Sequence, residues 1–183
     1  MQDLTELLAR DLDRGFESLV RAHQDRVYAF ALALCRRPDE AEDVAQDAFI
    51  RAYRALERYP AERRRELKPA AWLHRIALNV VRNRARGKRP QFVVLDGEVP
   101  DQSRGPAELA ELAGVREDLR ERLGRLPDRY RVSLLLRYAQ DLTYEEIAAV
   151  TRQPVGTVKS NVHRGLEMLR REFAGRSRPL EVG

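Results

Sequence analysis

The sequence lacks features that whole classes of protein require. Its single cysteine, Cys35, excludes an internal disulfide framework and fits a reducing compartment. No apolar run approaches the roughly 20 residues that a helix needs to cross a bilayer. The first 16 residues are acidic and amphipathic, unlike a signal peptide. We therefore expect a cytoplasmic protein without membrane insertion, in which Cys35 packs as a small apolar side chain.

Patterns typical of an active site or a metal centre are also missing. The three histidines, His23, His74 and His163, lie far apart and match no metal-ligand spacing. No glycine-rich phosphate loop and no HExxH pattern occurs. We predict that the chain is not an enzyme, has no catalytic or metal-binding residue and needs no cofactor. A nuclease that uses carboxylates and metal is the weaker alternative, because His74 is better interpreted as a helix-surface or satisfied residue than as a ligand.

Charge is abundant and is arranged in blocks. The net charge is +5. Residues 61–90 contain 10 Lys/Arg and 2 Asp/Glu, residues 152–183 contain 7 and 3, and the rest of the chain is net acidic. Solvated helix faces usually mix both signs, whereas surfaces that contact phosphate concentrate the positive one. The two separate basic blocks therefore predict two nucleic-acid-binding surfaces on one chain.

Apolar residues recur at helical spacing along most of the chain, and no segment alternates convincingly as a strand. One helix is expected over residues 16–34, and Asp39 is a plausible N-cap for the next. A basic loop over residues 60–68 then leads into a third helix, in which Trp72 is expected to belong to the core. The periodicity thus predicts an all-α fold.

The chain is expected to form two domains. Residues 90–106 contain three prolines and two glycines, a composition typical of a linker. We predict an N-terminal helical bundle and a C-terminal helix-turn-helix domain, joined by a flexible linker. The predicted boundaries are residues 1–89 for the bundle, 90–110 for the linker, 111–176 for the C-terminal domain and 177–183 for a tail.

The C-terminal domain carries the most specific local pattern. Thr143 followed by Glu146 forms a capping box, which predicts the start of a short helix. After a break at residues 151–154, a second helix places valines on one face and polar or basic residues on the other. An ordinary helical hairpin would explain the apolar face but not the basic one. The pattern therefore favours a helix-turn-helix with a DNA recognition helix.

Three segments, in this order, resemble parts of the sigma factors of bacterial RNA polymerase. DEAEDVAQDAFIRAYRAL resembles the region 2 helix that binds the polymerase clamp, and AAWLHRIALNVVRNRARGKR resembles the region 2 helix that reads and opens the promoter. LPDRYRVSLLLRYAQDLTYEEIAAVTRQPVGTVKSNVHRGLEMLRR resembles region 4. Regions 1.1 and 3 of the housekeeping factors are missing. The resemblance is therefore to the extracytoplasmic-function group of the sigma-70 family.

This resemblance implies a transcription initiation factor that directs core polymerase to promoters, reads the minus-ten and minus-thirty-five elements and promotes melting. The implied partners are core polymerase, through its β′ clamp and β flap, promoter DNA and an anti-sigma factor. The implied polymerase-binding residues are Glu42, Asp43, Gln46, Asp47 and Phe49. The implied minus-thirty-five residues are Gly156, Thr157, Lys159, Ser160, His163 and Arg164.

The minus-ten surface has support from spacing as well. Single-stranded DNA needs cations along its backbone and groups that hold unstacked bases. Five polar residues after Trp72 recur three or four apart, so they can share one helix face. The resemblance implies a role for one of them, because Asn79 matches a family asparagine that helps hold a flipped base. The predicted minus-ten residues are Arg63, Arg64, Arg65, Lys68, Arg75, Asn79, Arg82, Asn83 and Arg86.

One other class of DNA-binding protein competes with this interpretation. A dimeric helix-turn-helix regulator would explain residues 128–172 but would leave the first basic block without a role.

The chain departs from the family pattern in places. Asn161 and Leu166 stand where many relatives have arginine, and Arg152 stands where glycine is common. The segment over residues 60–68 is longer than usual, so we do not carry the family's base preference over to it.

Overall fold

The computed structural model describes residues 4–87, 114 and 118–174, and within them every regular element is helical. The all-α expectation is thus confirmed. The chain divides into two compact units, described separately below. The predicted linker over residues 90–110 lies outside the described residues. None of the described helices is long and apolar enough to cross a membrane.

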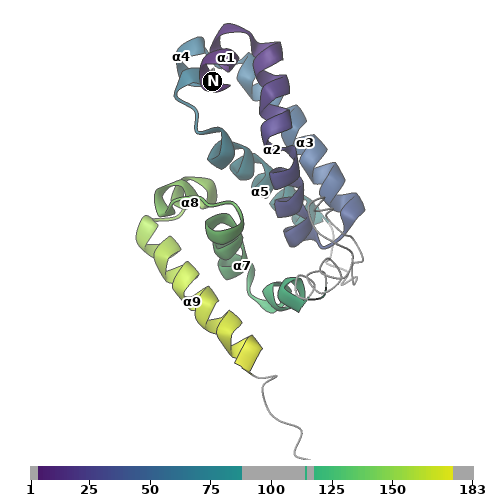
Figure 1. Cartoon of the computed structure of the whole chain (residues 1–183), viewed down its shortest axis with the longest axis vertical. Helices are drawn as coiled ribbons and strands as arrows, with labels where there is room; N and C mark the ends of the chain where they lie inside the picture. The colour runs from purple at the N-terminus through teal and green to yellow at the C-terminus, as the bar shows by residue number, and fades with distance from the viewer. Residues whose placement is uncertain (1–3, 88–113, 115–117, 175–183) are drawn as a thin grey trace, which may run out of the picture. The chain divides into compact units, whose positions relative to one another are not determined.

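Five helices form the N-terminal unit (Figure 1). The long helices α2 and α3 lie against each other, and both pack against α5. Leu19, Val44 and Leu73, one from each of these helices, are fully buried between them. The bounds are α1 Leu4–Arg10, α2 Leu12–Cys35, α3 Pro38–Glu57, α4 Ala61–Arg65 and α5 Pro69–Gly87.

Two sequence-based expectations for this unit are confirmed. Trp72 is only 7% exposed and lies near Tyr59, with ring centroids 6.2 Å apart. Cys35 is half-buried and packs against a core cluster that includes Ala31 and Val44. Both side chains therefore contribute to packing at the position where the apolar stripe predicted them.

Two local expectations are wrong. Asp39 is not the N-cap of α3; that position is Arg37, in an extended conformation, and Pro38 follows as the first helical residue. The fixed φ of proline suits the first helical position, so the helix begins there and Asp39 falls in its first turn. The basic segment after Pro60 is a short helix, α4, and not a loop.

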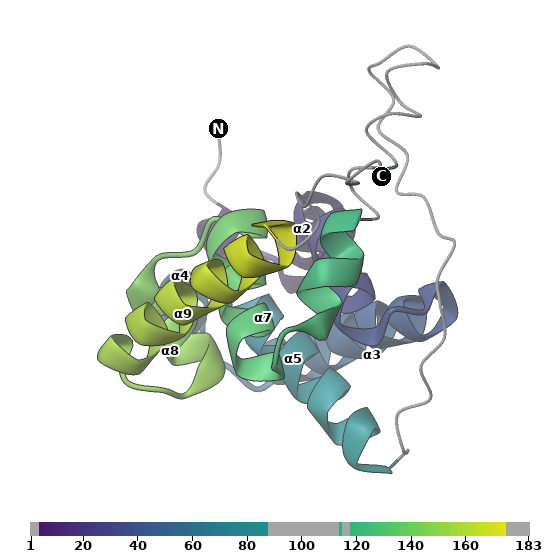
Figure 2. The same ribbon diagram turned by 90° about the horizontal axis from the view of Figure 1, so that it is seen from below.

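The C-terminal unit packs α7 (Asp128–Leu134) against α9 (Val155–Ala174), with α8 (Tyr144–Thr151) between them in sequence (Figure 2). Residues 118–125 are also helical, and Arg122 in this segment donates a hydrogen bond to the backbone oxygen of Glu172 near the end of α9. The helix expected up to Tyr138 changes at Leu135 into one π-helical turn, which ends at Ala139.

Candidate nucleic-acid interface

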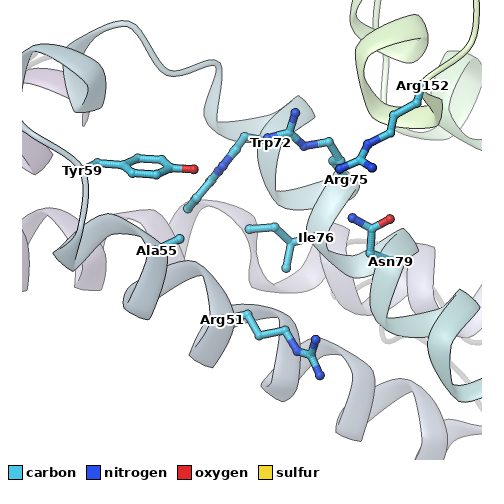
Figure 3. A pocket seen from close by; sticks show the side chains of 8 residues that line it. All are labelled: Arg51, Ala55, Tyr59, Trp72, Arg75, Ile76, Asn79 and Arg152. Carbon is cyan, nitrogen blue, oxygen red and sulfur yellow. The ribbon is translucent and has the colours of Figure 1, made fainter.

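Helix α5 separates an apolar face from a polar one. Leu73, Ala77 and Val80 are almost fully buried. The predicted minus-ten residues of this helix lie on its other side: Arg75 and Asn79 are half-buried, whereas Arg82, Asn83 and Arg86 are exposed. Figure 3 shows Arg75, Ile76 and Asn79 on α5, with Arg51 and Ala55 of α3 opposite them. The structure therefore brings the predicted residues of α5 onto one face.

The arginines on the polar face of α5 differ from Arg84 of the same helix in their ion pairs. Within residues 4–87, no ion pair involves Arg75, Arg82 or Arg86. The Asn79 amide likewise has no hydrogen-bond partner in that part of the chain. By contrast, Arg84 lies on another side of the helix and donates to a carboxylate oxygen of Asp43 at 3.1 Å. A row of unpaired guanidinium groups beside a free amide suits a phosphate backbone with a base held next to it.

The three consecutive arginines of α4 do not share one environment. The Arg63 guanidinium stacks over the Tyr59 ring, 3.8 Å from its centroid, and remains exposed. Arg64 is half-buried and donates to two backbone oxygens. Arg65 is exposed and pairs with Glu6, and Lys68 is exposed further along. Of the three arginines predicted to contact the minus-ten element, Arg64 is thus turned toward the protein, whereas Arg63 and Arg65 are exposed.

The acidic face of α3 is the predicted polymerase-binding surface. Glu42, Asp43 and Gln46 are exposed. Asp47 is held by Arg51 through two hydrogen bonds, at 2.8 and 3.0 Å. Ile50, on the same helix, is 45% exposed and was not singled out by the sequence reasoning.

Phe49, the remaining predicted polymerase-binding residue, is half-buried. Its ring meets the Phe16 ring edge-on, with centroids 6.4 Å apart. Part of this side chain therefore packs within the bundle, and only the remainder is open to a partner.

In the C-terminal unit, the capping box forms as predicted. The Thr143 backbone N–H donates to Glu146 at 3.0 Å, and the Glu146 backbone N–H donates to the Thr143 hydroxyl at 3.2 Å. The following helices have the order expected of a helix-turn-helix. All six predicted minus-thirty-five residues are exposed, while Val158, Asn161, Val162 and Gly165 are buried.

The turn between α8 and α9 explains two departures from the family pattern. Arg152 has a φ of 58°, the left-handed conformation that glycine adopts most easily. Asn161 is only 6% exposed, and its amide donates to the Gln153 side chain at 3.2 Å. The buried Asn161 side chain therefore connects α9 to the turn through this hydrogen bond. Because position 161 is buried, an asparagine there removes no cation from the exposed face of α9.

Two tyrosines that the sequence reasoning missed lie beside the recognition helix. The Tyr144 ring has the Arg137 guanidinium at 5.4 Å and the Lys159 ammonium at 5.7 Å from its centroid. Hydrogen bonds from Arg129 and Arg164 lower the pKa of Tyr130. Neither tyrosine belongs to α9, so no spacing within that helix indicated them.

The structure shows the surroundings of His74. His74 is 1% exposed, its Nδ1 lies 2.7 Å from the backbone oxygen of Ala70, and its ring meets Phe30 edge-on. Across the described ranges, no group of three or more His, Cys, Asp or Glu side chains could hold a metal ion. His74 is thus buried rather than on the helix surface, and its Nδ1 pairs with the backbone of its own helix.

The sequence matches two protein-family descriptions. Residues 19–91 match Sigma-70 region 2, and residues 116–169 match Sigma-70, region 4. Among curated proteins, the chain is 32% identical to the ECF RNA polymerase sigma factor SigW of Bacillus subtilis, over 87% of this chain and 89% of SigW. It is 35% identical to the RNA polymerase sigma-H factor of Pseudomonas aeruginosa, over 92% and 91%.

Solved structures agree with these matches. The structure of CnrH in complex with the cytosolic domain of CnrY superposes with a TM-score of 0.70 at 26% identity, over 95% of this chain and 97% of the other. The sigma factor RpoE, in complex with the anti-sigma factor NepR from Bartonella quintana, gives 0.68 at 25% identity, over 87% and 96%. The chain belongs to the extracytoplasmic-function sigma factors of the sigma-70 family, which are not enzymes but bind core RNA polymerase for promoter recognition.

Proposed function

We propose that the N-terminal unit reads and melts the minus-ten element while the C-terminal unit reads the minus-thirty-five element. The observation that carries this proposal is the polar face of α5, where arginines that form no ion pair within residues 4–87 lie on the same helix face as Asn79. The proposed domain boundaries are those predicted from the sequence: residues 1–89 would act at the minus-ten element and residues 111–176 at the minus-thirty-five element.

Melting requires a favourable binding free energy that offsets the free-energy cost of unpairing and unstacking bases. That cost is a few kcal/mol for each extruded base, and capture of the base by a protein site can supply it. The Asn79 amide can both donate and accept, so it can pair with the Watson–Crick edge of a base. Arg75, Arg82 and Arg86 would hold the phosphates on either side of that base.

The same proposal assigns partners and a compartment. The acidic face of α3 would dock on the polymerase clamp, and the C-terminal unit would also contact the β flap. One similar solved structure contains the sigma factor RpoE in complex with the anti-sigma factor NepR, and another contains CnrH in complex with the cytosolic domain of CnrY. We extend this to an anti-sigma factor for the present chain, and to action in the cytoplasm, where core polymerase resides.

The test requires purified core polymerase and a promoter identified by sequencing the transcripts that the holoenzyme initiates. Asn79→Ala should reduce open-complex formation about tenfold or more, because the captured base contributes about 1.4 kcal/mol or more. Closed-complex affinity should change little. A promoter already mismatched across the minus-ten element should restore activity to the mutant, because its unpairing cost has been removed in advance.

Asn83→Ala serves as the matched control, since it removes an amide one turn further along the same face. Its effect should be smaller than that of Asn79→Ala. If Asn79→Ala weakens closed and open complexes equally and lowers thermal stability, then Asn79 supports the bundle and the capture role is wrong. Full activity of Asn79→Ala on paired promoters would also overturn it.

A further inference from the structure

We propose that the N-terminal helix α1 positions the promoter-reading segment α4, and that Arg64 is a positioning residue rather than a DNA contact. This inference rests on the proposed role of α4 and α5 at the minus-ten element. Helix α1 precedes the residues 19–91 that match Sigma-70 region 2, so the family match assigns it no role. It nevertheless lies directly beside α4, as Figure 1 shows.

The first observation is how closely α1 approaches the bundle. A Cβ atom added at Gly15 of α2 would lie 2.6 Å from the Cα of Leu8 and 2.7 Å from its backbone nitrogen. Real Cβ atoms do not come so near to backbone, so only glycine permits this crossing. Leu8 itself is fully buried. Helix α1 is therefore fixed against α2 through its backbone and cannot slide without losing this contact.

The second observation is the position of the Arg64 guanidinium. Its Nε donates to the backbone oxygen of Leu56 at 3.0 Å, and Nη1 donates to that of Leu8 at 3.3 Å. Both oxygens belong to the last turn of a helix, α3 for Leu56 and α1 for Leu8. A cation there satisfies terminal carbonyl groups and interacts favourably with the helix dipole. Arg64 thus connects the ends of two helices to α4.

The third observation is a second link between the same helices. The Nε of Arg65 lies 2.9 Å from a carboxylate oxygen of Glu6 in α1. Both side chains are exposed, so this pair contributes little to stability but adds a constraint on orientation. With Arg64 and Arg65 facing α1, Arg63 is left on the outer side of α4, where it stacks on Tyr59. The position of α1 therefore decides which arginine α4 presents to DNA.

The experiment compares Arg64→Lys with Arg21→Lys, an exposed position on α2 outside the proposed sites, because both variants keep the charge. Lysine offers a flexible point charge and cannot reproduce the planar guanidinium that joins two carbonyl oxygens. Holoenzymes with each variant are measured on the mapped promoter and on a set in which each minus-ten base is replaced in turn. Hydrogen–deuterium exchange of α1 and α4 is recorded for each variant.

We expect Arg64→Lys to reduce discrimination among minus-ten bases several-fold and to speed exchange in α1 and α4, while the salt dependence of binding stays unchanged. Arg21→Lys should keep the discrimination. Glu6→Gln, which makes the surface more positive, should also reduce discrimination without weakening overall affinity. Intact discrimination in Arg64→Lys and Glu6→Gln would overturn the inference, even if thermal stability fell.

The outcomes also separate this inference from the function on which it rests. If Asn79→Ala and Arg63→Gln impair promoter opening or binding but Arg64→Lys behaves as the wild type, the positioning role alone is wrong. If none of these variants changes recognition of the minus-ten element, the proposed role of the N-terminal unit is wrong, and the positioning inference is overturned with it.

Discussion

Single residues decide how closely the helices of this protein approach one another. Gly15 and Gly165 both lie in helices, where glycine is normally unfavourable relative to alanine by roughly 0.5–1 kcal/mol. A Cβ at Gly15 would meet backbone atoms of Leu8 at under 3 Å, whereas a Cβ at Gly165 would meet the Leu134 side chain at 3.0 Å. Backbone cannot move aside as a side chain can, so the two glycines should respond differently to substitution.

We predict that Gly15→Ala destabilises the N-terminal unit by about 1–3 kcal/mol, the usual cost of forcing extra atoms into a packed interior. Gly165→Ala should be close to neutral, because the helix-propensity gain offsets a small shift of Leu134. Hydrogen exchange measured in increasing urea reports each unit separately. Equal losses for the two variants would contradict the difference in their surroundings.

Another effect at this scale is the titration of His23. Burial lowers its pKa below the usual 6.5, with smaller contributions from His74 and Arg26. The unfolded chain therefore binds a proton more readily than the folded one as the pH falls through about 6.5. The stability of the N-terminal unit should accordingly be full above this pH and decline below it.

His23→Gln should make this decline shallower, because it removes one group that must be protonated on unfolding. The measurement is the free energy of unfolding of wild type and mutant at several values between about pH 5 and 7.5. Parallel curves for the two proteins would show that His23 does not contribute to the pH dependence.

At the scale of elements, α9 combines a buried face with an exposed one that holds all six predicted minus-thirty-five residues. Asn161 and Gln153 fasten its N-terminal end to the turn, so the exposed face has a fixed orientation. Two of its cations contact tyrosines of the same unit, Lys159 with Tyr144 and Arg164 with Tyr130. The helix is therefore preorganised for contact with a groove or with phosphates.

Substitution of Lys159 or Arg164 by alanine should separate base reading from phosphate binding. Loss of a base contact should cost about 1–3 kcal/mol of promoter affinity and relax the preference at one position. Loss of a phosphate contact should instead lower the slope of log affinity against log salt by about one unit. Arg171→Ala, at an exposed position near the end of α9, provides the comparison. No change in either quantity would remove Lys159 and Arg164 from the interface.

At the scale of the whole molecule, acidic and basic surfaces are separated along the chain. The N-terminal unit carries the acidic face of α3 and the basic face of α5, and Arg84 links the two through its bonds to Asp43. Like charges gathered on one face favour partners of opposite charge. The acidic face is therefore suited to a basic protein surface and the basic faces to DNA.

Charge reversal at Asp43 should weaken co-purification with core polymerase and leave helicity unchanged. Because this variant also breaks the pair with Arg84, Arg84→Ala is the control that breaks the pair alone. Arg84→Ala should retain polymerase binding. Asp25→Arg, an exposed reversal on α2, controls for net charge. Undiminished binding by the Asp43 variant would exclude it from the docking surface.

Local patterns in the sequence were sufficient for the long helices and for the exposed faces of α5 and α9, but not for the short helix α4 or the π-helical turn after α7. Apolar spacing placed Trp72 and Val158 in the core, and the capping box located the start of α8, because these features depend on neighbours three or four residues apart. Family resemblance supplied the function, with which the matches to regions 2 and 4 agree. The implied site residues stay predictions.

Only the tertiary structure decided how residues distant in sequence are used. Arg63, Arg64 and Arg65 look alike in the sequence, yet their side chains have a tyrosine ring, two helix ends and a glutamate as partners. The need for glycine at position 15 depends on the backbone of Leu8 in another helix. Such roles arise from contacts between elements, which helical periodicity does not encode, because it specifies which face of a helix is buried but not what that face meets.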